Sequence, residues 1–152
     1  MFEQKLKDLG IEIPEAPKPL AAYIPGIKTG QIIYTSGQLP FKNGKLLSEG
    51  KLGKNITLEE GAKAAEQSAI NCLGVIKSIC GSLDNIEQII KLTVFVNSTE
   101  DFTAQPAVAN GASELMVKIF GEAGKHARSA VGVSQLPINA PVEIEIMAKI
   151  KE

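Results

Sequence analysis

Two side chains of opposite charge near the end of the sequence, Arg128 and Glu143, have the chemistry expected of a small ligand-binding site. A guanidinium group offers a planar pair of N–H donors that matches a carboxylate. A carboxylate in turn can move a proton to or from water. The residue types alone leave two interpretations open: a structural ion pair, or the two halves of a site.

Both residues lie in segments with the alternation of a β-strand. In residues 142–150 apolar and polar side chains alternate strictly, which predicts a half-buried strand with Glu143 on its polar face. Residues 126–133 show a shorter pattern of the same kind around Arg128. The intervening residues 135–141 include two prolines and an asparagine, which is typical of a connection. If the two strands pair or lie close, Arg128 and Glu143 are expected near the same end of a sheet.

The neighbours of these two residues also have more than one interpretation. Glu143 and Glu145 share one strand face, and at least one of them is expected to be a solvated or structural charge. His126 is the only histidine and stands two positions before Arg128. A single histidine with no second ligand does not predict a zinc site, and a structural or capping role is the more common use of such a residue.

One long helix and two shorter ones are expected to support the strands. Thr57 and Glu60 have the spacing of a capping box, and the apolar period of 3.6 residues that follows ends at Gly81. Its many alanines predict close packing onto a sheet. A second helix is expected over residues 101–121 and a short N-terminal one over residues 2–9.

Three more strands and two turns complete the predicted elements. Strands are expected at residues 20–27, 31–36 and 89–96. Turns are expected at Lys28-Thr29-Gly30 and at Lys42-Asn43-Gly44-Lys45. The order is therefore helix, two strands, a small hairpin, helix, strand, helix and two strands.

Length and composition predict one globular domain and exclude several classes of protein. The chain has 152 residues, 44% of them hydrophobic, which is enough to bury a real core. We assign residues 1–152 to a single domain, in which residues 1–19 form the N-terminal helix and a proline-rich connector. The 16 basic and 17 acidic residues leave a net charge of -1, so no nucleic-acid partner is expected.

The cysteines and the N-terminus bear on the compartment. Cys72 and Cys80 are separated by roughly 12 Å if both lie in one helix, too far for a disulfide. Two reduced thiols fit a cytoplasmic protein. The N-terminus has no apolar leader pattern, and no run is long enough to span a bilayer. We therefore expect a cytoplasmic protein with no membrane partner.

The sequence resembles the YjgF/RidA family over nearly all of its length. This family is also called the endoribonuclease L-PSP or reactive intermediate deaminase family, and the resemblance is to its YjgF/chorismate-mutase-like branch. The segments that carry it are Tyr23-Ile24-Pro25-Gly26, Thr35-Ser36-Gly37-Gln38-Leu39-Pro40, Lys91-Leu92-Thr93-Val94-Phe95-Val96, Asn110-Gly111-Ala112-Ser113, His126-Ala127-Arg128-Ser129-Ala130-Val131-Gly132-Val133 and Val142-Glu143-Ile144-Glu145. Together and in order they form a specific pattern.

The resemblance implies a fold and an assembly. The fold would be a chorismate-mutase-like α+β fold, a mixed sheet with two main helices packed on one face. The assembly would be a homotrimer with small-ligand pockets between subunits. The sequence adds one argument for assembly, because a single alanine-faced helix layer is too small to cover both faces of a sheet rich in Val and Ile.

The resemblance also implies an activity and a set of site residues. Members of this family hydrolyse 2-imino or 2-enamino acids to 2-oxo acids and ammonia, with no metal or organic cofactor. Arg128 would bind the substrate carboxylate and Glu143 would position or activate water. The pocket lining would include Tyr23, Ser36, Gly37 and Asn110. One position departs from the pattern: Ala130 stands where the deaminases commonly have cysteine.

Other functions remain open beside the deaminase. A non-catalytic protein that senses a small carboxylate would need the same Arg128 pocket. The endoribonuclease activity in the family's name is disfavoured by the balanced charge and the single histidine. Structural alternatives also remain, since Tyr23 could belong to the core and Ser36-Gly37 could be a simple turn at the end of a strand.

Overall fold

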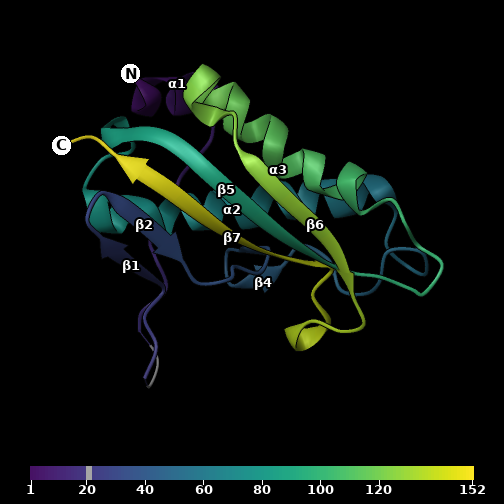
Figure 1. Ribbon diagram of the computed structural model, residues 1–152. Coiled ribbons are helices and arrows are strands. Elements are labelled where there is room, and N and C mark those ends of the chain that lie inside the picture. Colours follow the sequence, from purple (N-terminus) through teal and green to yellow (C-terminus); the bar gives the residue numbers. More distant parts are fainter. Residues whose placement is uncertain (20–21) are drawn as a thin grey trace.

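A five-stranded mixed sheet forms the centre of the molecule in the computed structural model, which describes residues 1–19 and 22–152 (Figure 1). Its strands lie in the order β1-β2-β7-β5-β6. They are β1 (Gly26–Thr29), β2 (Ile32–Thr35), β7 (Val142–Ile150), β5 (Ile86–Asn97) and β6 (Ala127–Val133). The first four pair antiparallel, and β6 joins β5 in parallel. The short strands β3 (Phe41–Lys42) and β4 (Lys45–Leu46) form a separate hairpin.

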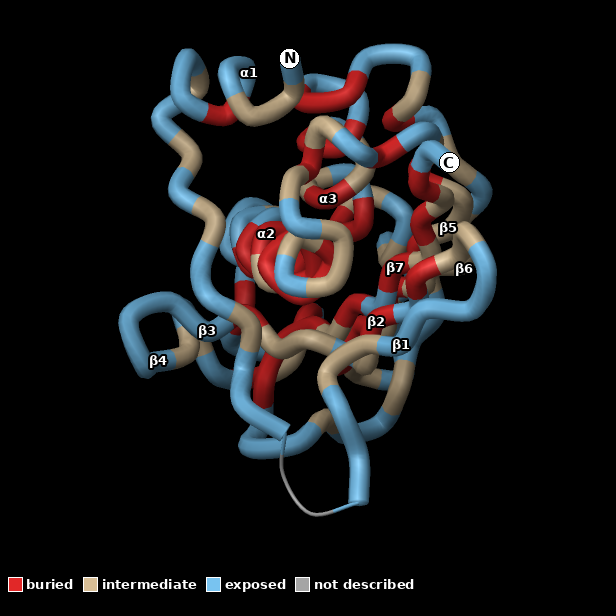
Figure 2. Tube along the Cα trace, turned by 90° about the vertical axis from the view of Figure 1, so that its left-hand side faces the viewer, coloured by how far each residue is buried: buried red, intermediate tan, exposed pale blue. Residues whose placement is uncertain are grey.

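Two main helices, α2 (Leu58–Cys80) and α3 (Gln105–Phe120), pack side by side on one face of the sheet (Figures 1 and 2). The short helix α1 (Phe2–Asp8) rests against α3 and the 3-10 turn η1 (Leu83–Asn85). There are two more 3-10 turns: η2 (Gly121–Gly124) precedes β6, and η3 (Pro137–Asn139) lies between β6 and β7 in the chain. The α+β class and the order of elements predicted from the sequence are confirmed.

The bounds of α2 follow from its own sequence. Thr57 accepts a hydrogen bond from the Glu60 backbone N–H, and the Glu60 carboxylate accepts one from the Thr57 N–H, so both halves of the capping box are present. At the other end Gly81 takes a positive φ of 83°, which is easy for glycine. The predicted helix is therefore confirmed at both ends.

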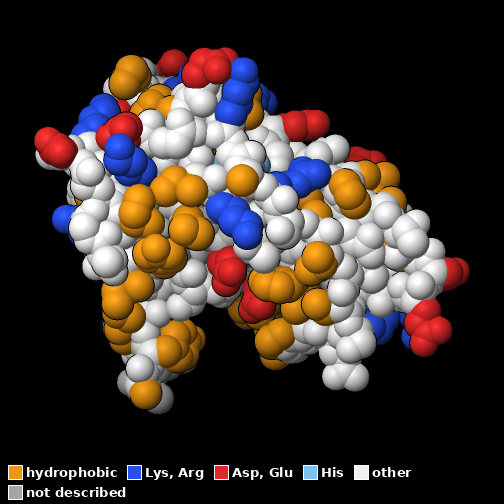
Figure 3. Space-filling model, in the orientation of Figure 1, with side chains coloured by type: hydrophobic (Ala, Val, Ile, Leu, Met, Phe, Trp, Pro, Cys, Tyr) orange, Lys and Arg blue, Asp and Glu red, His pale blue; other side chains and the backbone are white. Residues whose placement is uncertain are grey.

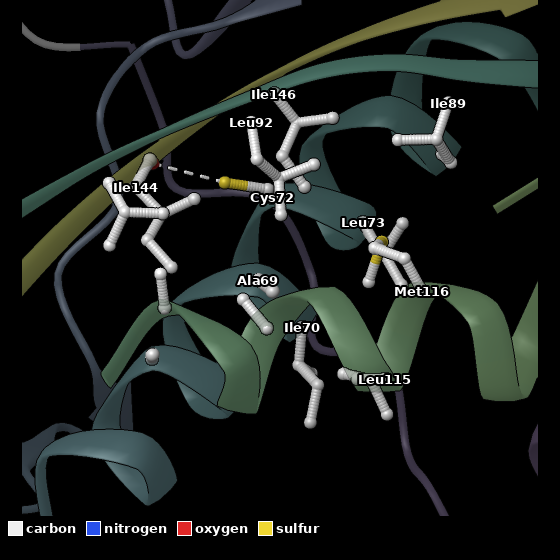
Figure 4. Packing of buried hydrophobic residues seen from close by; sticks show 14 of the residues in the cluster. Ala69, Ile70, Cys72, Leu73, Ile89, Leu92, Leu115, Met116, Ile144 and Ile146 are labelled. Carbon is white, nitrogen blue, oxygen red and sulfur yellow. Dashed lines mark hydrogen bonds between the residues drawn. The ribbon is translucent and has the colours of Figure 1, made fainter. Parts of the chain in front are cut away.

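The core lies between α2, α3 and the helix-facing side of the sheet. Fully buried side chains from β5 and β7, among them Leu92 and Ile146, meet Leu73 of α2 and Met116 of α3 (Figure 4). Cys72 lies in the same cluster and its thiol donates to the Ile144 carbonyl at 3.2 Å. Burial raises the pKa of this thiol to about 12. Both cysteines are free, as the sequence predicts.

Both boundaries of the first predicted strand were wrong. The strand expected over residues 20–27 starts only at Gly26, because Pro25 has no N–H to offer a ladder. Leu20 and Ala21 lie outside the described residues. The strand then continues through Lys28 and Thr29, which had been assigned to the turn.

The second helix also begins later than expected, at Gln105 rather than Asp101. The Thr99 hydroxyl donates to the Asp101 carboxylate at 2.8 Å, and the Phe102 N–H donates to the Thr99 carbonyl. These bonds close a separate turn, so Asp101 does not cap the helix.

No described helix covers the opposite face of the sheet. This open face carries the side chains of Ile27, Tyr34 and Val131, which are 54%, 40% and 44% exposed. Figure 3 shows two groups of hydrophobic side chains that are separated by a few basic and acidic side chains. Among the residues described, none of the helices has the length and apolar character needed to cross a membrane.

Candidate functional site

Arg128 lies on edge strand β6 and is directed toward α3. It pairs in register with Leu92, which is fully buried under the helices. Its Nη1 donates to Asn110 Oδ1 at 2.9 Å and to Ser113 Oγ at 3.1 Å. Asn110 and Ser113 are three positions apart on α3 and so share one side of that helix. The structure thus brings two predicted site residues, Arg128 and Asn110, into direct contact.

His126 extends this group of side chains. Its Nε2 lies 2.9 Å from Ser113 Oγ, and its Nδ1 lies 2.6 Å from the Gly124 carbonyl oxygen. Gly124 is tightly packed, since a Cβ there would lie 2.1 Å from the Met116 carbonyl oxygen. We call Arg128, Asn110, Ser113 and His126 the arginine cluster.

The sequence did not identify Ser113 as part of this cluster. The signal was its spacing from Asn110, because residues at i and i+3 are neighbours on a helix. That spacing becomes informative only when β6 is known to lie beside α3. The sequence favours a structural or capping role for His126, and its contact with the Gly124 carbonyl at the end of η2 fits that role. His126 also contacts Ser113, a direct partner of Arg128.

Glu143 lies on β7 and is directed toward the open face of the sheet. It pairs in register with Phe95, whereas its neighbours Val142 and Ile144 are buried on the helix side. Gly37 passes directly over its side chain, and a Cβ at Gly37 would lie only 2.8 Å from Glu143 Cδ. Any larger residue at this position would require the Glu143 side chain to shift.

The segment around Gly37 is held by hydrogen bonds on both sides. Gln38 and Ile144 exchange backbone hydrogen bonds of 2.7 and 3.0 Å. The Ser36 hydroxyl donates to the Ile24 carbonyl at 2.8 Å, which fixes the stretch that follows Tyr23. Tyr23 is 58% exposed, so the interpretation of Tyr23 as a core residue is wrong. We call Glu143, Gly37 and Ser36 the glutamate cluster.

The environment of Glu143 favours its protonated form. Burial raises the pKa of the Glu143 carboxyl above its ordinary value, and the charge of Glu145 on the same strand face raises it further. A carboxyl whose pKa is moved toward neutrality is better suited to exchange protons with water at physiological pH.

The two clusters lie on opposite faces of the sheet. Strands β6 and β7 do not pair, because β5 lies between them. Arg128 aligns with Leu92 and Glu143 with Phe95, an odd number of positions apart on β5, so their side chains leave the sheet on opposite sides. No ion pair joins Arg128 and Glu143, both of which lie among the described residues. The ion-pair interpretation is therefore wrong for a single chain.

The grooves of the described chain lie elsewhere. One of about 680 Å³ runs between the N-terminal segment, α2 and the β3–β4 hairpin, and is lined by Ile11, Phe41 and Gln67 among others. None of the predicted site residues lines it.

Ala130 is half-buried and packs against the core next to Arg128. Within residues 1–19 and 22–152 no group of three or more His, Cys, Asp or Glu side chains is placed to hold a metal ion.

Comparison with known proteins agrees with the fold. Residues 3–150 match the profile of the family described as YjgF/chorismate mutase-like, putative endoribonuclease. Protein TCP17 of Trypanosoma cruzi is 41% identical over 146 residues, which are 95% of this chain and 91% of that protein. The 2-iminobutanoate/2-iminopropanoate deaminase of Dermatophagoides farinae is 29% identical over 146 residues, 93% of this chain and 95% of that enzyme.

A solved structure gives the same result. The crystal structure of Atu1372 from Agrobacterium tumefaciens, a protein of unknown function, superimposes with a TM-score of 0.91 at 41% identity. The alignment covers 99% of this chain and 92% of that chain. The chorismate-mutase-like fold predicted from the sequence is confirmed.

Proposed function

The chain belongs to the YjgF/chorismate mutase-like family, and on that premise we propose that it hydrolyses small 2-imino or 2-enamino acids to 2-oxo acids and ammonia. The observation that carries the proposal is the pair of half-sites, one with a held guanidinium and one with a carboxyl of raised pKa. A relative named as a deaminase of 2-imino acids, similar over 93% of this chain, supports the same chemistry.

The chemistry divides between the two clusters. Arg128 binds the substrate carboxylate through two parallel hydrogen bonds, which fixes the C=N carbon in the pocket. Glu143 takes a proton from water as the oxygen adds to that carbon, and then returns a proton to the nitrogen. In the resulting carbinolamine a second proton passes from the hydroxyl to the nitrogen by way of Glu143, so the C–N bond breaks as the carbonyl forms and ammonia leaves. Tyr23, Ser36, Gly37 and Asn110 line the pocket in this proposal.

The pocket forms between two copies of the chain. Within one chain the two clusters face opposite sides of the sheet, so a site that uses both needs Arg128 from one subunit and Glu143 from its neighbour. Edge strand β6 and the open sheet face with Ile27, Tyr34 and Val131 are the surfaces available for assembly. A closed homotrimer would repeat this contact three times.

The direct test generates a 2-imino acid in situ with an amino-acid oxidase and follows release of the 2-oxo acid. The protein is expected to accelerate release above the spontaneous rate. Saturable binding with no acceleration would show a sensor of small carboxylates instead. Cleavage of RNA that disappears in Arg128→Ala would show a nuclease.

Mixed oligomers test whether the pocket is shared. Arg128→Lys and Glu143→Gln chains are each expected to keep only a small residual activity alone. After unfolding and refolding together in equal amounts, about one pocket in four should combine an intact Arg128 with an intact Glu143. Recovery of about a quarter of the parent activity would support the shared site. No recovery in a verified mixed oligomer would place both residues in one chain's pocket or in none.

A further inference from the structure

With His126 neutral, the hydrogen bonds of the arginine cluster have a single consistent direction. A carbonyl oxygen only accepts, so the 2.6 Å contact to Gly124 O requires the proton of His126 on Nδ1. In the neutral ring Nε2 then carries a lone pair, and the Ser113 hydroxyl donates to it across 2.9 Å. A guanidinium only donates, so Ser113 Oγ accepts from Arg128 Nη1.

Ser113 therefore connects Arg128 and His126 through a single hydroxyl group, which few other side chains could do. Its hydroxyl accepts from Arg128 and donates to His126 at the same time. A hydroxyl engaged on both sides is held in one orientation, and hydrogen bonds in such a chain strengthen one another. Arg128, His126 and Gly124 are thereby linked from β6 to η2 through one atom of α3.

The same contacts decide which edge of the guanidinium meets a ligand. Both side-chain hydrogen bonds of Arg128 in the described chain start from Nη1, one to Asn110 and one to Ser113. Of the five guanidinium N–H groups, about three remain, on Nη2 and Nε. Nε and Nη2 together form one straight edge that matches the two oxygens of a carboxylate.

We propose that Ser113 and His126 are positioning residues that fix the guanidinium of Arg128 through Nη1, so that its Nε–Nη2 edge is presented to the substrate carboxylate. The inference rests on the proposed function, in which Arg128 is the carboxylate anchor. Neither Ser113 nor His126 needs to touch the substrate. Their contribution is to order a long flexible side chain before the ligand arrives.

The first experiment needs no ligand. Because His126 is the only histidine, a ¹⁵N–¹H NMR spectrum of the imidazole reports this site without assignment. At a pH where the ring is neutral, its proton is expected on Nδ1, and the Arg128 Nε–H is expected to be ordered in the parent and mobile in Ser113→Ala. A ring protonated on Nε2, or an equally ordered Arg128 in Ser113→Ala, would overturn the proposal.

The second experiment separates the two ends of the imidazole. His126→Gln can place an acceptor where Nε2 lies, and His126→Asn can place a donor where Nδ1 lies. Pyruvate binding is measured by calorimetry on the intact oligomer. Loss of order in one long side chain is worth roughly three- to tenfold in affinity. We expect that loss in Ser113→Ala and His126→Asn, and near-parent affinity in Ser113→Thr and His126→Gln.

The opposite ranking would overturn the proposal. If His126→Asn keeps affinity and His126→Gln loses it, the histidine acts only by anchoring Gly124. Turnover supplies a further check, since positioning of a carboxylate anchor should raise KM more than it lowers kcat. The Arg128→Lys variant distinguishes a failure of the proposed function from a failure of the positioning role. If Arg128→Lys binds pyruvate as the parent does, the proposed function fails. If it loses binding while Ser113→Ala keeps it, only the positioning role fails.

Discussion

The arginine cluster and the glutamate cluster hold their functional groups by different means. Arg128 is fixed by side chains, because Asn110 and Ser113 accept hydrogen bonds from its Nη1 and His126 in turn contacts Ser113. Glu143 is enclosed by backbone, since Gly37 passes over it within contact distance. No side-chain hydrogen bond of the Glu143 carboxylate occurs within the described chain.

The difference shows which of the two clusters already holds its functional group in a fixed position. The arginine cluster has a satisfied network and is built to hold a charge in one place. The glutamate cluster removes water from a carboxyl, beside another carboxylate, and so leaves it ready to take up a proton. In the proposed function a binding group and a proton-transfer group need these opposite environments. Within one chain the sheet keeps the two groups apart, and in the proposed site a second chain supplies the other half.

The largest expected effect is on binding at the arginine cluster. Arg128→Lys keeps the charge but loses the bidentate fork. A charge-assisted hydrogen bond contributes about 1.5–3 kcal/mol, so pyruvate affinity should fall roughly ten- to hundredfold by calorimetry. Circular dichroism and the thermal midpoint should stay close to the parent. Equal affinity in the variant and the parent would place the ligand elsewhere.

The next effect concerns the backbone over Glu143. Gly37→Ala adds a Cβ that would lie 2.8 Å from Glu143 Cδ, so the carboxyl must move. Gly37 has no positive φ, and the substitution therefore strains contacts rather than the backbone. We expect turnover to fall about tenfold with little change in KM.

A double-mutant cycle isolates this mechanism. If Gly37 acts through Glu143, the Gly37→Ala change should cost nothing further in a Glu143→Gln chain, so the two effects are not additive. Additive losses would show that Gly37 serves another purpose, such as the fit between subunits.

The smallest effect is on stability. The pKa of the Glu143 carboxyl is raised in the folded state, so the folded chain binds this proton more tightly than the unfolded chain does. The protonated carboxyl therefore contributes stability below the unfolded pKa. This contribution is lost as the pH rises through the folded pKa. Glu143→Gln removes this dependence. At neutral pH the variant's Tm should exceed the parent's by about 1–2 °C.

The Tm difference between variant and parent should disappear as the pH falls below the pKa of the Glu143 carboxyl, where the parent carboxyl is also neutral. Scanning calorimetry across this range checks both sign and window. Glu145→Gln is the matched control on the same strand face. A variant less stable than the parent at neutral pH would show that the Glu143 charge is stabilised by a partner.

Much of the fold could be predicted because its signals are local. The capping pair Thr57 and Glu60 lies within one turn, and Asn43-Gly44 forms its hairpin with positive φ values of 52° and 79°. The start of α3 was misplaced because Asp101 resembles a cap in sequence but is bonded to Thr99 in a turn. A side chain with two available partners cannot be assigned from the sequence alone.

The sequence by itself identified the candidate site residues Arg128 and Glu143 and determined which face of its own strand each one takes. Alternation along β7 placed Glu143 opposite Val142 and Ile144, and this was confirmed. Only the tertiary structure decided how the faces of different strands relate. Because β5 lies between β6 and β7, and Leu92 and Phe95 point to opposite sides, Arg128 joins α3 while Glu143 turns to the open face. Register between strands is set by long-range packing, which the period of one strand does not contain.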